Sequence, residues 1–483
     1  MISEQLIVKS KVKTYYPTAV MVVWGIACWL FFQFWYSYHF FFQEQNQLFL
    51  WSWDYISTYF DKSGGLARLI GDFLTQFYYY LYAGATILSL CLLTIGVLLY
   101  KALRHLRVSK QVALMLSLLV MTFLAFCHFS TSYRLTSTIS VLGWVLTLYT
   151  VGTVLSVYWA VHRKNRPYCV LAACALLPAW LLFGKPEVKR MQGPDFILEK
   201  NFAIDNEYYF GHYDKVIETV KNSDGWNDQM LFFYNLVMAH RGELPDHLLD
   251  FTPNYLGTFD KIGPETPLLT IRNMNELYWL LGDMTFTERA AMMTNVFSAD
   301  NRNVRMMRRL AECNFVSGDS LAAEKYLRIL DKTLAYRKWA QNVREHGQTI
   351  YREKMRLVNQ HDTITISDNA HFLMMQLLDA HPDNTMALDY ILCSNLLLKD
   401  ISNFKRDYDR YCMDTGSPRL KVLYQEALCI WLAGTNAPQE EWERYIKRPD
   451  VFQQFQQYNA QRGNPRFKGT YWYYFDKQKA PEV

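Results

Sequence analysis

Three aspartates stand among aromatic residues in one segment, residues 43–78, and are the residues of this chain best placed to do chemistry. Asp54 and Asp61 lie in LFLWSWDYISTYFD, and Asp72 lies in LARLIGDFLTQF. A carboxylate in such surroundings acts as a general base or binds a metal ion. Membrane glycosyltransferases that use lipid-linked sugars place an essential acid in a comparable loop, so one hypothesis is an enzyme site. The alternative is that the three aspartates form the solvated face of interfacial helices.

Other patterns that carry chemistry are missing from the sequence. It holds no GxxxxGKS/T phosphate loop, no GxGxxG, no HExxH and no GxSxG elbow. His240 and His247 share one predicted hairpin but stand seven residues apart, and His39 and His128 lie near the ends of apolar runs. We interpret these histidines as structural or interfacial groups, and we expect neither a metal ion nor a cofactor.

The elements that must position the aspartates are membrane spans. Five apolar runs stand at about 17–42, 79–100, 111–129, 138–161 and 167–184. The last run has eighteen residues without a charge, and a helix of about that length crosses a hydrocarbon core of about 30 Å. The first run is too long for a secretory signal and offers no cleavage site. Residues 1–16 are therefore predicted to be a cytoplasmic N-terminus before an uncleaved span.

The basic residues of the short loops orient these spans. Ten fall on the side of the N-terminus and three on the other: Lys9, Lys11, Lys13, Lys101, Arg104, Arg107, Lys110, Arg163, Lys164 and Arg166, against Lys62, Arg68 and Arg134. Five spans then place residues 185–483 outside the cytoplasm, in the periplasm of a two-membrane bacterium. Lys185, Lys189 and Arg190 follow the fifth run and oppose this bias. One span more or fewer would reverse the side of the tail.

The loop 43–78 is predicted to hold two helices that lie in the membrane interface. Apolar residues recur in it at helical spacing: Leu66, Leu69, Ile70, Phe73, Leu74 and Phe77. The glycines of DKSGG separate this helix from an aromatic-rich one before it. A path across the membrane is disfavoured, because each aspartate would cost about 2.5–3.5 kcal/mol at the bilayer centre.

The tail predicts an all-α fold, in which a transmembrane helix bundle precedes a tetratricopeptide-like solenoid of helical hairpins. Four glycines end one apolar helix and precede the next, at separations of 31, 40 and 36 residues: Gly211, Gly242, Gly282 and Gly318. The tetratricopeptide period is 34 residues. Pro382 and Gly434 mark further turns. The aromatic string YWYYF, residues 471–475, is predicted to dock onto this domain, with the membrane surface as the alternative.

The composition of the chain limits the classes of partner that it can bind. A net charge of +5 with no long basic run excludes a nucleic-acid surface. Stacked helical hairpins receive peptides or partner helices, so we expect protein partners for the tail and the lipid bilayer for residues 17–184. The disulfide status of four tail cysteines stays open: Cys313, Cys393, Cys412 and Cys429.

Several strings carry a family resemblance: KSGGLARLIGDFLTQFYYY in the loop, then GHYDKVIE, YNLVMAHRGEL, TLAYRKWA and YWYYF in the tail. Over most of its length the chain resembles an uncharacterised family of polytopic envelope membrane proteins of the Bacteroidota type. The resemblance implies a membrane domain followed by a tetratricopeptide-like domain, and it implies no activity.

The predicted function is protein binding or scaffolding in envelope biogenesis, from the cytoplasmic (inner) membrane and without catalysis. The alternative is a membrane glycosyltransferase-like enzyme that uses a lipid-linked donor, with Asp54, Asp61 and Asp72 in its site. A transporter subunit is the weakest interpretation, because no charged residue lies well inside a span to mark an ion path.

Overall fold

The computed structural model describes residues 2–161, 168–186, 192–258, 260, 265–358, 367, 369–416 and 419–481. Every regular element among these residues is a helix, which confirms the all-α prediction. The chain divides into two compact units. The first comprises Met1–Ala203, Arg302–Arg305 and Leu327–Asn342, and the second comprises Ile204–Asn301, Met306–Tyr326 and Val343–Val483.

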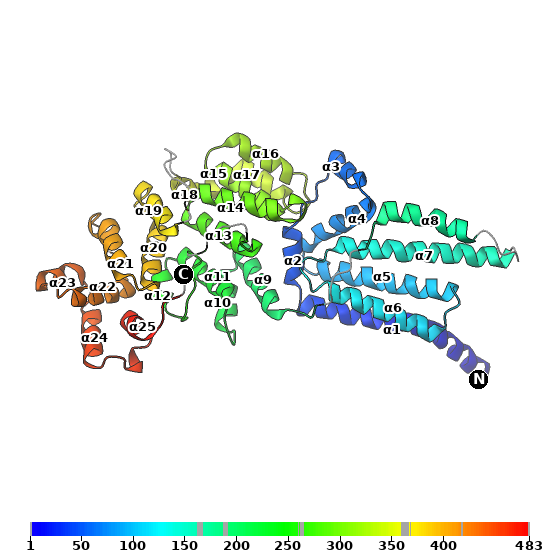
Figure 1. The fold of residues 1–483 in the computed structure, drawn as a ribbon, viewed down its shortest axis with the longest axis horizontal. Coiled ribbons are helices and arrows are strands. Elements are labelled where there is room, and N and C mark those ends of the chain that lie inside the picture. The colour runs from blue at the N-terminus through cyan, green and yellow to red at the C-terminus, as the bar shows by residue number, and fades with distance from the viewer. Residues whose placement is uncertain are drawn as a thin grey trace. The chain divides into compact units, whose positions relative to one another are not determined.

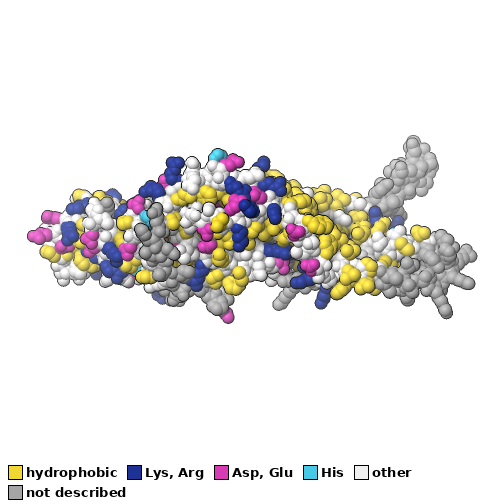
Figure 2. Space-filling view, turned by 90° about the horizontal axis from the view of Figure 1, so that it is seen from above, with side chains coloured by type: hydrophobic (Ala, Val, Ile, Leu, Met, Phe, Trp, Pro, Cys, Tyr) yellow, Lys and Arg dark blue, Asp and Glu magenta, His cyan; other side chains and the backbone are white. Residues whose placement is uncertain are grey.

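The first unit is a bundle of long helices with short helices at one end (Figure 1). Its helices are α1 (Ile2–Phe34), α2 (Tyr38–Gln45), α3 (Trp53–Ser57), η1 (Thr58–Asp61), α4 (Gly65–Thr75), η2 (Gln76–Tyr79), α5 (Ala83–His105), α6 (Lys110–Cys127), α7 (Leu135–Val161) and α8 (Tyr168–Phe183). Figure 2 shows mostly hydrophobic and uncharged side chains over the bundle, and charged side chains spread over the second unit.

Within the part of the chain that the structure describes, four stretches are long and apolar enough to cross a membrane: Tyr16–Phe34, Ala83–His105, Lys110–Cys127 and Leu135–Val157. They match four of the five predicted spans. The fifth, 167–184, is occupied by α8, which has 16 residues and packs along α7 (Figure 1). At 1.5 Å per residue α8 measures about 24 Å, less than a core of about 30 Å. Its role as a span stays a prediction.

Small residues let the helices of the bundle approach closely. A Cβ on Gly96 of α5 would lie 2.1 Å from the sulfur of Met121 of α6. A Cβ on Gly71 of α4 would lie 2.5 Å from the Cα of Thr136 of α7. Glycines at helix crossings are typical of membrane bundles, in which close backbone packing drives association.

The first apolar run forms two helices rather than one. α1 ends at Phe34 and α2 begins at Tyr38, so the predicted span 17–42 contains a turn. The carboxylate of Glu199 accepts the N–H groups of Tyr38 (2.5 Å) and His39 (3.2 Å). These N–H groups have no partner within α2. Because the group that binds them stands some 160 residues along the chain, the local apolar pattern gives no sign of the break.

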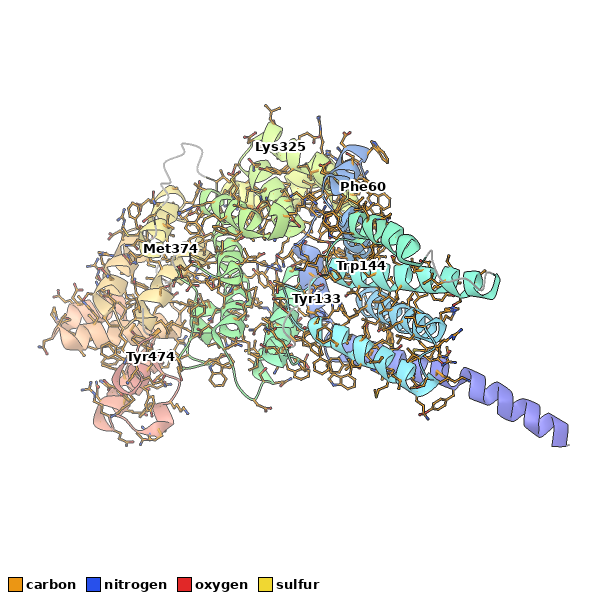
Figure 3. The ribbon with its side chains drawn as sticks, turned by 45° about the vertical axis from the view of Figure 1, so that its right-hand side comes forward. Phe60, Tyr133, Trp144, Lys325, Met374 and Tyr474 are labelled. Carbon is orange, nitrogen blue, oxygen red and sulfur yellow. The ribbon has the colours of Figure 1, made fainter. Side chains whose placement is uncertain are left out.

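The loop 43–78 contains the two predicted helical stretches. α3 and η1 carry the aromatic part, Gly64 adopts a left-handed backbone with φ 82°, and α4 follows. α4 packs on α7 and α8, with Ala67 and Gly71 buried. Phe60 of η1, labelled in Figure 3, has an exposed side chain. The position of these helices in a membrane interface stays a prediction.

The second unit contains shorter helices. They are α9 (Phe196–Tyr209), α10 (Tyr213–Lys221), α11 (Asp228–His240), α12 (Leu244–His247), α13 (Leu268–Leu281), α14 (Met284–Phe297), η3 (Ala299–Asn301), α15 (Val304–Val316), α16 (Ser320–Leu330), α17 (Arg337–Ile350), α18 (Arg352–Arg356), α19 (Ala370–Ala380), α20 (Thr385–Leu397), α21 (Ile401–Tyr408), the π-helix η4 (Asp409–Met413), α22 (Val422–Gly434), α23 (Gln439–Tyr445), α24 (Pro449–Ala460), η5 (Pro465–Phe467) and α25 (Tyr471–Lys477). The boundary between the units falls inside four of them, α9, α15, α16 and α17. Pairs such as α10 and α11, α13 and α14, and α19 and α20 pack together.

The four glycines that predict turns all adopt a left-handed backbone after a helix. The φ angles are 76° at Gly211, 71° at Gly242, 91° at Gly282 and 83° at Gly318. Glycine adopts this conformation without the penalty that a Cβ brings. The turns are therefore confirmed, including the one at Pro382 between α19 and α20. The finer assignment of these helix pairs to a tetratricopeptide-like solenoid stays a prediction.

The aromatic string 471–475 forms α25 and is docked on its own domain. Tyr471 Oη donates to Leu396 O at 2.9 Å, and Tyr474 Oη donates to Leu397 O at 2.6 Å (Figure 3 labels Tyr474). The predicted docking is confirmed. The four tail cysteines whose state the sequence leaves open are free and buried: Cys313, Cys393, Cys412 and Cys429.

Candidate functional site

A small pocket that opens to solvent lies in the first unit, with an enclosed volume of about 10 Å³, room for about one water-sized group. Four segments form it: the end of α2 with the residues that follow, η2, and two stretches from far along the chain. Its lining residues are Glu44, Gln47, Leu48, Phe49, Gln76, Val304, Thr333, Leu334, Ala335 and Tyr336. We call it the Glu44 pocket.

Glu44 is the acid of this pocket. Its carboxylate accepts a hydrogen bond from Tyr336 Oη at 3.1 Å, and its side chain is buried. Burial raises the pKa of Glu44 to about 8, and the bond from Tyr336 offsets only part of that rise. A carboxyl group whose pKa lies near neutrality takes up or releases a proton readily, which is typical of functional sites.

Amide side chains surround Glu44 because the sequence around it is QEQNQ. Gln47 Nε2 donates to Asp72 O at 3.2 Å, and Gln76 Nε2 donates to Phe73 O at 2.8 Å. Next to Glu44 in the sequence, Gln45 Oε1 accepts from Arg305 Nη1 at 3.0 Å. These bonds fix the polar end of α2, and Gln76 Oε1 also accepts from Trp51 Nε1 at 3.3 Å.

The three predicted site residues occupy two different environments. Asp54 and Asp61 are exposed on α3 and η1. Asp72 is 8% exposed and accepts a hydrogen bond from Tyr59 Oη at 2.8 Å. Burial and the nearby Asp72 raise the pKa of Tyr59 above its ordinary range, so Tyr59 stays a neutral donor. Only Asp72 reaches the Glu44 pocket, through its backbone carbonyl.

The aromatic helix before α4 is held by an arginine. Arg302 Nη1 donates to Tyr55 Oη at 2.8 Å, and the guanidinium lies 4.7 Å from the ring centre of Tyr55 and 5.7 Å from that of Tyr59. Such cation–π contacts each contribute about 0.5–2 kcal/mol. Arg302 therefore fixes Tyr55 and lies over Tyr59, the tyrosine that donates to Asp72.

Sequence reasoning did not single out Glu44, although one signal for it existed. Glu44 is the one acidic residue between Pro17 and Trp53, at the end of an aromatic run. An isolated acid beside a membrane span is a candidate for a functional group. Its partner Tyr336 lies 292 residues away, and no local pattern predicts that contact.

The histidines near span ends are buried. His39 lies 3.8 Å from Glu199, and burial lowers its pKa to about 3, with His128 adding a smaller effect. His128 Nε2 lies 2.8 Å from Thr138 Oγ1. His240 packs on Tyr213 with ring centres 4.7 Å apart. Among the described residues, no group of three or more His, Cys, Asp and Glu is arranged to hold a metal ion.

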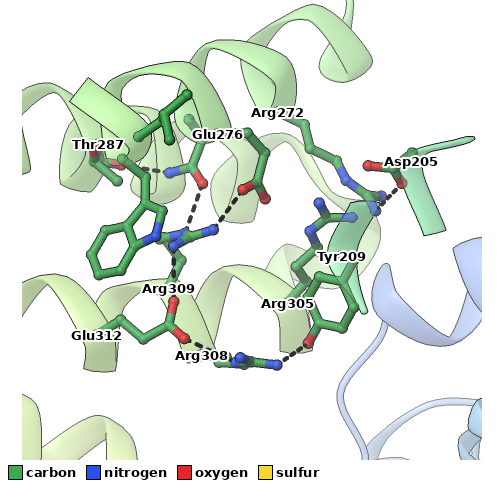
Figure 4. Close-up of polar contacts among 12 residues, drawn as sticks. Asp205, Tyr209, Arg272, Glu276, Thr287, Arg305, Arg308, Arg309 and Glu312 are labelled. Atoms are coloured by element: carbon green, nitrogen blue, oxygen red, sulfur yellow. Dashed lines mark hydrogen bonds and ion pairs between the residues drawn. The ribbon is translucent and has the colours of Figure 1, made fainter. Parts of the chain in front are cut away.

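A network of charged residues is buried inside the second unit (Figure 4). Arg309 of α15 donates to Glu276 of α13 at 2.7 Å and lies 2.9 Å from Glu312. Arg308 donates to Glu312 at 3.0 Å and to Tyr209 Oη at 2.8 Å. Each buried cation thus has an acidic partner, which is what burial of charge requires. We interpret the network as structural, since it joins α9, α13 and α15.

Two more buried cations, Arg272 and Lys354, lie beside this network. Arg272 Nη2 donates to Asp205 at 2.6 Å. Lys354 Nζ donates to the carbonyls of Trp279 (2.6 Å) and Leu280 (2.7 Å), which stand at the C-terminal end of α13 where carbonyls lack helical partners. Burial, and then the charge of Arg309, lower the pKa of Lys354 to about 7. Lys354 therefore caps α13.

The fold defines a class: a helical protein with a bundle apolar enough to span a membrane, followed by a second helical unit. A model of a family of unknown function (DUF6057) matches residues 13–184 and 158–478, which together cover nearly the whole chain. The protein belongs to this family. No curated protein and no solved structure matches the chain.

Proposed function

We propose that this protein is a membrane-anchored, protein-binding component of the cell envelope, with its second unit displayed outside the cytoplasm. The observation that supports the role is the architecture of the second unit, a domain of packed helix pairs joined to a bundle with four candidate spans. Helix-pair domains bind peptides and helices along their surfaces.

The distribution of basic residues supports this orientation of the bundle in the membrane. The end of the bundle where α5 passes into α6 carries Lys101, Arg104, Arg107 and Lys110, and it is opposite the end with α2 and α4 (Figure 1). Basic loop residues stay in the cytoplasm. The end with α2 and α4 then faces outward, and α8 as a fifth span leads the chain to the same side.

α14 offers a surface with which to test partner binding. Three of its apolar side chains are about half exposed: Met292, Val296 and Phe297. Met292 and Val296 are one helical turn apart and share a face. Exposed apolar side chains gathered on one face are typical of interaction sites.

Photo-crosslinking in intact cells tests the proposal. A photoreactive residue at Val296 is expected to give discrete adducts with envelope proteins, and Met292→Asp in the same chain is expected to remove them. The control position is Glu440 on α23, which is exposed and is expected to give none. Equal adducts at both positions, or none at Val296, would count against protein binding through this surface.

The second candidate is the glycosyltransferase-like enzyme. The observation that favours it is that the loop 43–78 forms a wall of the Glu44 pocket and buries Asp72 beside it. An enzyme of this kind loses function in Asp72→Asn or Asp54→Asn while the fold stays intact. Protein binding through the second unit tolerates both changes. A complementation assay with these variants and a folding control separates the two candidates.

A further inference from the structure

We propose that the Glu44 pocket binds a primary ammonium group, carried either by a small free amine or by a lipid headgroup. The inference concerns the first unit alone, so it does not depend on protein binding by the second unit.

The pocket is preformed, because hydrogen bonds between distant segments hold its walls. The N–H of Val304 donates to Gln47 O at 3.0 Å, and the N–H of Trp51 donates to Lys332 O at 2.7 Å. Thr333 Oγ1 accepts the N–H of Tyr336 at 3.2 Å. Walls that are fixed before binding lose little conformational entropy when a ligand enters.

The side-chain donors around the pocket are already bound to acceptors of the protein: Tyr336 Oη to Glu44, Gln47 Nε2 to Asp72 O, Gln76 Nε2 to Phe73 O, and Thr333 Oγ1 to Leu330 O. An ionised carboxylate offers about four acceptor positions, and Tyr336 occupies one of those of Glu44. With these side-chain donors occupied and acceptor positions left on Glu44, the pocket favours a ligand that donates hydrogen bonds.

Charge selects a cation among such ligands. The described residues that line the pocket include no Lys or Arg, so none of them balances an ionised Glu44. A primary ammonium donates three hydrogen bonds and carries the balancing charge, whereas a neutral polyol brings no charge and leaves Glu44 with its proton. Phe49 and Tyr336 also line the space, and aromatic faces attract cations. A quaternary ammonium has the charge but no N–H donor.

The protonation of Glu44 makes the binding of an ammonium group dependent on pH. Burial raises the pKa of Glu44 to about 8, so an ammonium that pairs with it near neutral pH must displace a proton. The neighbouring groups do not replace Glu44 in this role: Tyr336 donates to it, Tyr79 packs on Tyr336, and Arg305 binds Gln45. The affinity is therefore expected to rise about tenfold per pH unit below 8 and to level off above.

Calorimetry on the full chain in nanodiscs of phosphatidylglycerol, with ethanolamine as the probe, tests the proposal. Ethanolamine is expected to bind at pH 8, and choline and glycerol at least tenfold more weakly. Glu44→Gln is expected to weaken binding at least tenfold, whereas Glu440→Gln, which makes the same change at an exposed acid of the second unit, leaves it unchanged. Ethanolamine binding that survives Glu44→Gln, or glycerol binding equally well, would overturn the proposal.

A second measurement needs no variant. Titrations at pH 7 in two buffers of different ionisation enthalpy are expected to show release of close to one proton per ethanolamine bound. Binding without proton release would refute the assignment to Glu44, even if the Glu44→Gln chain failed to fold.

Nanodiscs of phosphatidylethanolamine distinguish the two sources of the ammonium group. If the headgroup is the ligand, these nanodiscs abolish the binding of free ethanolamine that phosphatidylglycerol permits. If a free amine is the ligand, ethanolamine binds equally in both. Either result supports an ammonium site, and absence of ethanolamine binding in phosphatidylglycerol contradicts it.

Discussion

At the scale of single residues, the protein buries carboxyl groups whose pKa values lie near neutrality. Burial raises the pKa of Glu44 and of Glu199 to about 8 each, against an ordinary value of 4.5. One of these groups lines a pocket and the other caps α2. Through both groups, the stability of the first unit therefore depends on pH.

The stability of the first unit is expected to fall as pH rises. A folded-state pKa above the unfolded value means that the contribution is fully present below pH 4.5 and is lost as pH rises through about 8. The loss at pH 9 is on the order of a few kcal/mol, since one pKa unit corresponds to about 1.4 kcal/mol. Melting temperatures of the full chain in detergent from pH 5 to 9 measure it. Glu44→Gln should flatten the decline, and a decline of the same size in this variant would contradict the role of Glu44.

The buried network of the second unit predicts a large effect for one arginine. Arg309→Leu leaves Glu276 and Glu312 without their shared cation inside the protein, and loss of one partner from a buried pair costs about 3–5 kcal/mol. The control is Arg344→Leu, whose pair with Glu324 is partly exposed and contributes about 0–1 kcal/mol. Urea unfolding followed by circular dichroism gives both values, and equal losses would show that the network adds no stability.

The sequence draws attention to some of these acidic residues and gives no sign of the burial of others. Asp54, Asp61 and Asp72 attract attention because an acid among aromatic residues is conspicuous, yet two of them are exposed. Glu44 and Glu199 owe their environment to partners more than 150 residues away. Burial that depends on such distant contacts leaves no periodic signal in the chain.

At the scale of elements, local signals are more reliable. The amphipathic pattern of residues 66–77 predicts α4, and four glycines predict four turns, because a left-handed backbone is a property of the residue itself. The turn between α1 and α2 was not predictable in this way, since apolar and aromatic residues continue through it. The short length of α8 was not evident either, as its apolar run reads as one complete span.

Gly318 tests the turn assignment. It joins α15 to α16 with φ 83°, and a Cβ there would meet no atom within 4 Å. Gly318→Ala is therefore expected to cost about 1–2 kcal/mol through backbone strain alone. Gly225 is a matched control, because it also has open space around it but no left-handed φ. Gly225→Ala should be neutral or slightly stabilising, and equal effects at the two sites in urea unfolding would contradict the conformational argument.

At the scale of the whole molecule, the protein combines an apolar helix bundle with a second, charged helical unit, and it belongs to a family of unknown function. The arrangement explains why the composition averaged over the whole chain says little about the protein. The apolar composition of the bundle and the polar composition of the second unit offset each other in the mean. It also makes the side of the membrane on which the second unit lies the central question for function.

A topology reporter answers that question most directly. An enzyme that is active only outside the cytoplasm is fused after Val483 of the full chain, and in a second strain after Val108, between α5 and α6. We predict activity at Val483 and none at Val108, as an odd number of spans with α8 as the fifth requires. Activity at Val108, or a cytoplasmic report at Val483, would contradict the proposed display of the second unit outside the cytoplasm.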